Sequence, residues 1–396
     1  MKEDDKIGIK ELSKKQYIPL KQDHKINNFG YIFKFTFVSI ICVVIFLFFI
    51  YHINNRNNQL KIILSRKSID TNRNDKDFLE KLKLILDNEE ILENEMMNKH
   101  TTFQLGGPAK YFIKPKSINK IIKVLKLCKE YSIEYFILGN GSNLLVSDHG
   151  YDGLIINIHE ENFSELKVEE IDEAHNKITV GGGILMRTLA KKMCLLSLSG
   201  LEDIIDIPGT IGGGIIMNAS AGGKGLNIYI TIEKILLYNS LQKVKVITPE
   251  GEIKELSKKE CNLRSRGSLL QDKKYLVIEA TFNLIKDDKM KIQKAMADHT
   301  SLRYSRQPMY FPSAGCFFVW IKPKHGSLYE KYKENNLVSY KVGDAMIYTH
   351  NIAFIVNLGN AKSSDVYEIV THVEKIMKSK YNIYIRREVV VLGSFQ

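Results

Sequence analysis

Apolar residues follow a different pattern in each successive part of the chain. Residues 1–30 are polar and mixed in charge, a composition typical of a disordered segment without a folded core. Residues 31–53 are almost continuously apolar, and about 20 such residues span a lipid bilayer. We therefore expect one transmembrane helix over residues 31–53, and a buried core helix is the alternative. The Asn-rich stretch 54–77 that follows is expected to serve as a linker.

The basic residues that flank this apolar segment indicate its orientation. Those before it are Lys21 and Lys25, and those after it are Arg56, Lys61, Arg66 and Lys67. Because Lys and Arg are retained on the cytoplasmic side of a membrane, the excess favours a cytoplasmic location for the rest of the chain, tethered to the cell membrane. No small-residue cleavage site follows the segment, which argues against a signal peptide.

From about residue 78 onward, apolar residues at helical spacing alternate with short runs typical of buried strands. Helices are predicted over residues 78–92, from Ser117 to Cys128, from Leu185, over 288–303 and from Ser364. Strands are predicted over residues 133–138, 153–157, 177–180, 232–238, 243–248 and 275–284, and near the C-terminal end. The mixture indicates an α+β fold. The pattern changes near residue 290, which separates a domain over 78–289 from a second domain over 290–396.

Composition and charge narrow the class of ligand. The chain is 44% hydrophobic and 26% charged, as expected for globular domains, and its formal net charge is +12. Because the lysines are scattered and no zinc-finger or RNP-like pattern occurs, we expect anionic small molecules such as nucleotides rather than nucleic acid. There are five cysteines and no CxxC pair, which argues against a disulfide framework and against a metal site. The sequence carries no signal for the oligomeric state.

Two glycine-rich loops are candidate phosphate contacts. Residues 208–214 read PGTIGGG, and residues 139–143 read GNGSN directly after a predicted strand. Glycine allows a close approach of the backbone, whose exposed N–H groups then form a site for an anion. The first loop matches neither the Walker nor the Rossmann phosphate motif. A tight turn that binds nothing is the alternative.

Seven separated stretches resemble one family, UDP-N-acetylenolpyruvoylglucosamine reductase (MurB), and occur in that family's order. They are NKHTTFQLGGPA (98–109), LGNGSNLLVSD (138–148), SGLEDIIDIPGTIGGGIIMNA (199–219), SRGSLLQ (265–271), RYSRQPMYFPSAGCFF (303–318), VGDAMIYTHNIAFIVNLGNAKSSDV (342–366) and REVVVLG (387–393). The resemblance implies an FAD-binding fold of the vanillyl-alcohol-oxidase type, made of two α+β subdomains, followed by an α+β substrate domain. The compact part after residue 290 resembles the type II form of the family.

The resemblance also implies the cofactors and the substrate. NADPH would reduce FAD, which would then reduce UDP-N-acetylglucosamine enolpyruvate to UDP-N-acetylmuramate, a precursor of peptidoglycan. The residues expected to hold FAD are Gly139, Asn140, Gly141, Ser142, Asn143, Leu144, Pro208, Gly209, Thr210, Gly212, Gly213, Asn218 and Ala219. No histidine occurs in residues 139–143, so a covalent link to the flavin is not suggested there.

Three catalytic residues are carried over from the family's motifs. Arg266 matches the arginine that meets the substrate carboxylate, with Arg264 as the competing candidate. Cys316 takes the position of the proton donor, which is usually serine, and a free thiol with a pKa of about 8.5 is a far stronger acid than a hydroxyl. Glu388 matches the glutamate that assists at the carboxylate or in proton delivery. A buried thiol and a structural ion pair are the alternatives for Cys316 and Glu388.

Several positions depart from the family's pattern. Ser265 replaces a tyrosine, residues 218–223 lack another tyrosine, and residues 319–320 and 348–353 differ where the family lines its uridine-sugar pocket. Two other functions therefore stay open at this point. One is a flavoprotein of the same fold that oxidises another small alcohol or sugar, and the other is a non-catalytic membrane-bound partner of cell-wall enzymes.

Overall fold

The computed structural model describes residues 53, 56, 74–219, 239–319 and 327–395. The expected transmembrane segment, apart from Ile53, and the predicted strand at 232–238 lie outside these residues. Within them, no helix is long and apolar enough to cross a membrane. Residues Asn74–Gln396 form one compact unit, and its architecture is described below.

The first sheet of this unit has four strands in the order β1-β2-β5-β3. Their bounds are Ile91–Met96 for β1, Pro108–Ile113 for β2, Tyr151–Asn157 for β5 and Tyr135–Leu138 for β3. Strands β2, β5 and β3 are parallel, and β1 is antiparallel to β2. A helix over residues 74–85 and α2 (Ile118–Tyr131) bury their apolar side chains in the core associated with this sheet. The predicted helix at Ser117 is confirmed, because the Ser117 side chain caps α2.

The predicted helix over residues 78–92 was wrong in its second half. The helix ends at residue 85, and a short 3-10 turn η1 (Asn88–Glu90) leads into β1. Leu92 therefore lies in β1 opposite Phe112 rather than on a helical face. Periodicity misled here because Leu92 is apolar in either structure, and its position seven residues after Ile85 also fits one face of a helix.

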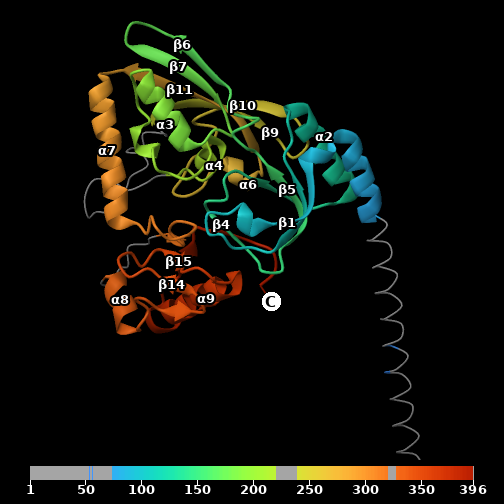
Figure 1. Ribbon diagram of the computed structural model, residues 1–396, viewed down its shortest axis with the longest axis vertical. Helices are drawn as coiled ribbons and strands as arrows, with labels where there is room; N and C mark the ends of the chain where they lie inside the picture. The colour runs from blue at the N-terminus through green and yellow to red at the C-terminus, as the bar shows by residue number, and fades with distance from the viewer. Residues whose placement is uncertain (1–52, 54–55, 57–73, 220–238, 320–326, 396) are drawn as a thin grey trace, which may run out of the picture. The chain divides into compact units, whose positions relative to one another are not determined.

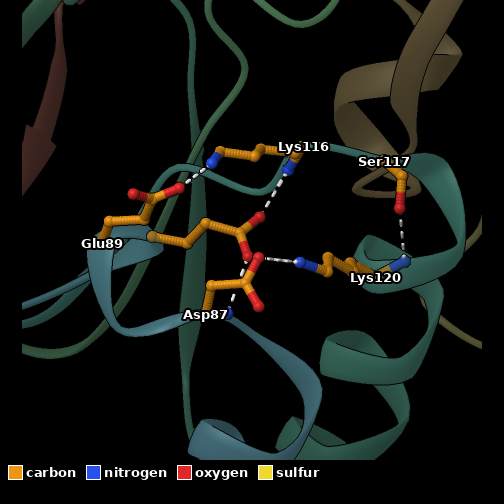
Figure 2. Close-up of polar contacts among 6 residues, drawn as sticks. Asp87, Glu89, Lys116, Ser117 and Lys120 are labelled. Atoms are coloured by element: carbon orange, nitrogen blue, oxygen red, sulfur yellow. Dashed lines mark hydrogen bonds and ion pairs between the residues drawn. The ribbon is translucent and has the colours of Figure 1, made fainter.

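A buried carboxylate fixes this junction. Glu90 is 1% exposed, and its two oxygens accept hydrogen bonds from the backbone N–H groups of Lys116 (2.7 Å) and Asp87 (2.8 Å). The Nζ of Lys120 donates a third bond to Glu90 at 2.5 Å. Figure 2 shows Asp87, Lys116 and Lys120 gathered here, beside the Ser117 hydroxyl that caps α2. A single side chain thus satisfies backbone donors from two separate segments.

The second sheet follows the order β10-β9-β11-β7-β6, and a short strand β8 pairs with β11. The bounds are Ile253–Ser257 (β10), Leu241–Ile247 (β9), Leu276–Lys286 (β11), His175–Gly181 (β7), Leu166–Glu170 (β6) and Leu198–Ser199 (β8). Helices α3 (Met186–Leu195), α4 (Ile211–Ile216) and α6 (Leu269–Asp272) pack on it with the 3-10 turn η3 (Glu202–Ile204). Helix α7 (Lys289–Arg306) runs along one side of the unit in Figure 1. These elements confirm the predicted strands at 177–180, 243–248 and 275–284 and the helices that begin near 185 and 288.

The C-terminal region gathers at one end of the unit in Figure 1. It contains β13 (Lys341–Val342), β14 (Ala345–Ile347) and β15 (Ile355–Asn357) in one sheet, β12 (Phe318–Val319) paired with β16 (Arg386–Arg387), and helices α8 (Leu328–Glu334) and α9 (Ser363–Tyr381). The helix predicted from Ser364 is confirmed, because Val366, Ile369, Val370 and Val373 are all fully buried.

The end of the chain returns to the first half of the unit. Strand β17 (Val390–Leu392) pairs in parallel with β4 (Leu144–Val146), which follows the loop at residues 139–143. The Asp148 carboxylate then accepts hydrogen bonds from the first N–H groups of α9, those of Ser363 and Ser364, at 2.8 and 2.9 Å. The C-terminal region is therefore tied directly to the segment that carries one glycine-rich loop.

Candidate active site

One cavity of about 980 Å³ lies where these elements meet. Residues 139–144 and 207–210 line it, and so do Arg266, Cys316 and Glu388. The structure therefore brings both glycine-rich loops and the three catalytic candidates to one place, although they are far apart in the sequence. Of the expected cofactor residues, Gly212 and Asn218 do not line this cavity.

The loop at residues 139–143 is a tight connection between β3 and β4. Gly141 has a φ of +62°, and a Cβ there would lie 2.0 Å from the His100 carbonyl oxygen. A Cβ on Gly139 would lie 2.6 Å from the Thr210 Oγ1 of the other loop. The side-chain amide of Asn157 holds the start of the loop by donating to the Gly139 carbonyl at 2.9 Å. The two loops thus approach each other closely, as required for a shared ligand.

The second loop enters the short helix α4. The Thr210 hydroxyl accepts a hydrogen bond from the Gly213 N–H at 3.2 Å, which turns the chain from the loop into the helix. Gly212 packs against the second sheet instead, with its N–H bonded to the Gly182 carbonyl at 2.8 Å. Asn218 is 4% exposed and donates its side-chain amide to the Arg264 carbonyl at 3.0 Å. Gly212 and Asn218 therefore support neighbouring backbone rather than face the cavity.

Arg266 is presented by a tight turn. The backbone groups of Arg264 and Gly267 bond each other in both directions, and Arg266 between them has a φ of +54°. Its Nε lies 3.1 Å from the Glu388 Oε1. Arg264 instead forms an ion pair with Asp272, with both side chains about half exposed. Geometry thus separates the two arginines that the sequence left as competitors, and only Arg266 lines the cavity.

Glu388 lies in a buried, positively charged corner of the cavity. Its side chain is 14% exposed. Burial raises the pKa of the Glu388 carboxyl, and the charges of Arg266 and Arg386 oppose that rise without cancelling it. The carboxyl is therefore easier to protonate than an exposed glutamate.

Cys316 faces the same corner. Burial raises the pKa of its thiol to about 12; the charge of Glu388 adds to this rise, and those of Arg266 and Arg303 oppose it. The thiol is consequently neutral near pH 7 and carries a proton. Cys128 and Cys194 are 1% and 6% exposed and do not line the cavity.

Arg303 is a cavity residue that sequence reasoning missed as a site. It lies near the end of α7, and its Nε and Nη1 are buried without a hydrogen-bond partner. Asp206, whose charge acts on Arg303, is already engaged by Arg187 at 3.1 Å. Since Arg303 opens the family-like stretch 303–318, that resemblance was a signal that could have singled it out.

The residues of the cavity fit FAD and an anionic substrate. Residues 139–144 and 207–210 line the cavity, although a Cβ on Gly139 or Gly141 would meet Thr210 or His100 rather than open space. A buried guanidinium with two unpaired nitrogens calls for an anionic partner, because such donors are costly to leave unsatisfied. A ligand that carries phosphate or carboxylate groups would supply that partner.

Comparison with known proteins identifies the family. The model of an FAD-binding domain matches residues 109–257, and that of the UDP-N-acetylenolpyruvoylglucosamine reductase C-terminal domain matches residues 307–392. A UDP-N-acetylenolpyruvoylglucosamine reductase of Lachnoclostridium phytofermentans is 33% identical over 315 residues, which cover 80% of this chain and 97% of that protein. The chain belongs to the UDP-N-acetylenolpyruvoylglucosamine reductase family. The predicted resemblance, and the α+β fold with an FAD-binding domain and the family's C-terminal domain, are confirmed.

Other members of the UDP-N-acetylenolpyruvoylglucosamine reductase family support this assignment. The protein of that name from Clostridium novyi is 34% identical over 327 residues, covering 83% of this chain and 98% of that protein. The crystal structure of the reductase from Thermus caldophilus is 27% identical, covers 77% of this chain and 98% of its own, and has a TM-score of 0.60. The chain thus contains nearly the full length of these reductases.

Proposed function

We propose that this protein reduces UDP-N-acetylglucosamine enolpyruvate to UDP-N-acetylmuramate with electrons from NADPH, through non-covalently bound FAD. The observation that carries the proposal is the meeting of Arg266, Cys316 and Glu388 with both glycine-rich loops in one cavity. The relatives that bear the reductase name match the chain over nearly their whole length. They favour this reaction over oxidation of another alcohol or sugar and over a non-catalytic role.

The chain's own residues would bind and orient the reactants. When bound, FAD supplies the hydride that NADPH delivers and the enolpyruvyl double bond accepts. The backbone of residues 139–143 and 208–210 would hold the FAD diphosphate, and the side chain of Arg303 would meet an anionic group in the same cavity. Both loops and Arg303 line the same cavity of about 980 Å³.

Arg266 would stabilise the charge that develops at the substrate carboxylate. Hydride addition makes the carbon beside this carboxylate carbanion-like, so negative charge grows on the carboxylate oxygens. A fixed guanidinium stabilises such charge best when it needs no reorganisation. The turn at residues 264–267 and the 3.1 Å contact with Glu388 hold Arg266 in place. Glu388 would assist at this carboxylate or in delivery of the proton.

Cys316 would donate the proton that completes the reduction. Its thiol is protonated near neutral pH because burial raises its pKa. The proton would pass from Sγ to the carbanion-like carbon and leave a thiolate. Arg266 and Arg303 act electrostatically on Cys316 to stabilise that thiolate. A thiol can therefore serve where the family usually has a serine hydroxyl.

We further propose that the FAD-binding domain covers residues 78–289 and the substrate domain residues 290–396. Residues 31–53 would tether the enzyme to the cell membrane, with the catalytic part in the cytoplasm. The apolar length of that segment and the basic residues after it support this arrangement. Cysteine labelling of intact cells tests the orientation: a reagent that cannot cross the membrane should leave the catalytic part unlabelled.

Purification of the full-length protein in detergent allows a direct test of the reaction. We expect a flavin spectrum and NADPH oxidation that depends on the enolpyruvyl substrate. A yellow protein that oxidises NADPH at the same rate with and without this substrate would contradict the proposal. Turnover of another alcohol or sugar in that assay would favour the oxidase alternative instead.

A further inference from the structure

Glu388 is held in place by the main chain as well as by its ion pair. Its N–H donates to the Phe317 carbonyl at 2.8 Å, directly after Cys316 in the chain. Its carbonyl accepts a hydrogen bond from the side-chain amide of Asn143 at 3.0 Å. The Val390 N–H then donates to the Asn143 carbonyl at 3.0 Å. Asn143 therefore contacts the Glu388 segment through both its side chain and its backbone.

The parallel pairing of β4 and β17 explains why these segments meet. Val390 lies opposite Leu144, so both strands begin at the same edge of the pair. The loop that enters β4 and the segment that enters β17 consequently lie side by side. The first is the glycine-rich loop at 139–143, and the second carries Glu388. Asn143 lines the cavity with the other residues of that loop.

We propose that Asn143 is a positioning residue that couples the flavin loop to Glu388. This inference rests on the proposed function. A hydrogen bond to the Glu388 carbonyl fixes the rotation of the backbone at residue 388. That rotation sets where the carboxylate lies relative to Arg266, 3.1 Å away. Any ligand that orders the loop through its backbone therefore also orders Glu388 for the reduction of the substrate.

Single-turnover kinetics of the full-length protein test the coupling. In Asn143→Ala, measured at saturating FAD, substrate reduction should slow by about 10- to 100-fold, as expected for a misplacement of about 1 Å. Substrate reduction should fall at least about tenfold more than flavin reduction by NADPH does, because only substrate reduction uses Glu388. Asn143→Leu keeps nearly the size of the side chain and removes the donor without adding a charge, so it should show the same split if Asn143→Ala binds FAD poorly.

A double-mutant cycle shows whether Asn143 acts through Glu388. In the Glu388→Gln background, Asn143→Ala should slow substrate reduction by less than about twofold further. Asn157→Ala is the matched control, since Asn157 holds the same loop but bonds to Gly139 rather than to Glu388. The fold-loss that Asn157→Ala causes in the rate of substrate reduction should be the same in the wild type and in the Glu388→Gln background.

Four outcomes separate the possibilities. The coupling would be overturned if the rate losses of Asn143→Ala and Glu388→Gln in substrate reduction simply multiply in the double variant. It would also be overturned if Asn143→Ala slows flavin reduction and substrate reduction equally. The same non-additivity in Asn157→Ala would also overturn it, because general loosening of the loop would then explain both. A wild-type protein that binds FAD but does not reduce the substrate would instead refute the proposed function, which the wild-type assay reveals before any variant is made.

Discussion

Replacing Cys316 should separate the two halves of the proposed reaction. Cys316→Ala removes the proton donor and leaves Arg266, Glu388 and both glycine-rich loops in place. Substrate reduction should then fall by about 10²- to 10⁴-fold, the usual contribution of a positioned acid. Flavin reduction by NADPH should stay within about twofold, since it takes no proton from this thiol. Cys316→Ser keeps a donor hydroxyl and should retain substantial turnover.

The raised pKa of the Cys316 thiol also predicts how slowly this thiol is alkylated. With a pKa of about 12, about one thiol in 10⁴ is ionised at about pH 8, whereas about a quarter of free thiols with a pKa of about 8.5 are ionised there. Only the thiolate reacts with an alkylating reagent. A thiolate with a higher pKa is also more nucleophilic, so iodoacetamide should modify Cys316 about 10- to 100-fold more slowly than a free thiol at the same pH.

Stopped-flow absorbance measures both half-reactions. Flavin bleaching by NADPH reports the first, and recovery of the oxidised spectrum on mixing with the enolpyruvyl substrate reports the second. Substrate reduction by Cys316→Ala at the wild-type rate would remove the thiol from the mechanism. Alkylation of Cys316 at the rate of a free thiol, followed by mass spectrometry of the modified peptide, would refute the electrostatic reasoning.

Three further changes probe stability, binding and pH dependence. Glu90→Ala removes the acceptor of two partly buried backbone N–H groups and should lower the free energy of unfolding by about 1–3 kcal/mol, as measured in urea. Arg303→Met removes an unpaired buried guanidinium and should raise the KM for the enolpyruvyl nucleotide about tenfold or more in steady-state assays. Burial raises the folded-state pKa of Glu388, so the folded state gains less from this group as pH rises through that value. The Tm of the wild type should thus fall relative to that of Glu388→Gln in thermal scans as the pH rises above about 4.3, the ordinary pKa of a glutamate.

Matched variants control the first two of these changes. Glu89 neighbours Glu90 but pairs with Lys116 in solvent, 68% exposed, so Glu89→Ala should hardly alter the unfolding transition. Arg306 lies on the same helix as Arg303 but is exposed and outside the cavity, so Arg306→Met should leave the KM unchanged. If Glu89→Ala lowers the free energy of unfolding as much as Glu90→Ala does, the role assigned to Glu90 is contradicted. If Arg306→Met raises the KM as much as Arg303→Met does, the role assigned to Arg303 is contradicted. A Tm difference for Glu388→Gln that does not vary with pH would contradict the raised pKa.

The sequence was sufficient for the local elements and for the family. Apolar spacing predicted α2 and α9 with their buried faces, because a helix repeats every 3.6 residues whatever it packs against. The ordered motifs brought Arg266, Cys316 and Glu388 together as candidates, and the cavity contains all three. The glycines at 139 and 141 allow the loop to pack closely against Thr210 and His100, whereas the ligand contact that the sequence suggested for them stays a prediction.

What the sequence could not predict depends on contacts between distant residues. Nothing near Asn143 reveals that it bonds to Glu388, 245 residues later. The sequence also could not predict that Gly212 and Asn218 bond to neighbouring backbone, because a glycine or an asparagine that contacts protein and one that contacts a ligand look identical in a sequence. Leu92 was assigned to a helix since only the buried Glu90 network shows where that helix stops. The sequence offered only the family-like stretch 303–318 as a signal for Arg303, and the unpaired buried nitrogens that mark it as a site residue appear only in the structure.

The pairing of β4 with β17 has a consequence for synthesis of the protein. During translation, β4 leaves the ribosome about 245 residues before β17, the only strand that pairs with it among the described residues, and until then β4 is unpaired. An unpaired edge is a site for association with other chains, and a pairing so distant in sequence closes slowly. The flavin loop is therefore completed only when the last strand arrives. The nascent chain must protect that edge for most of its time on the ribosome, which makes this strand a natural point of contact for chaperones.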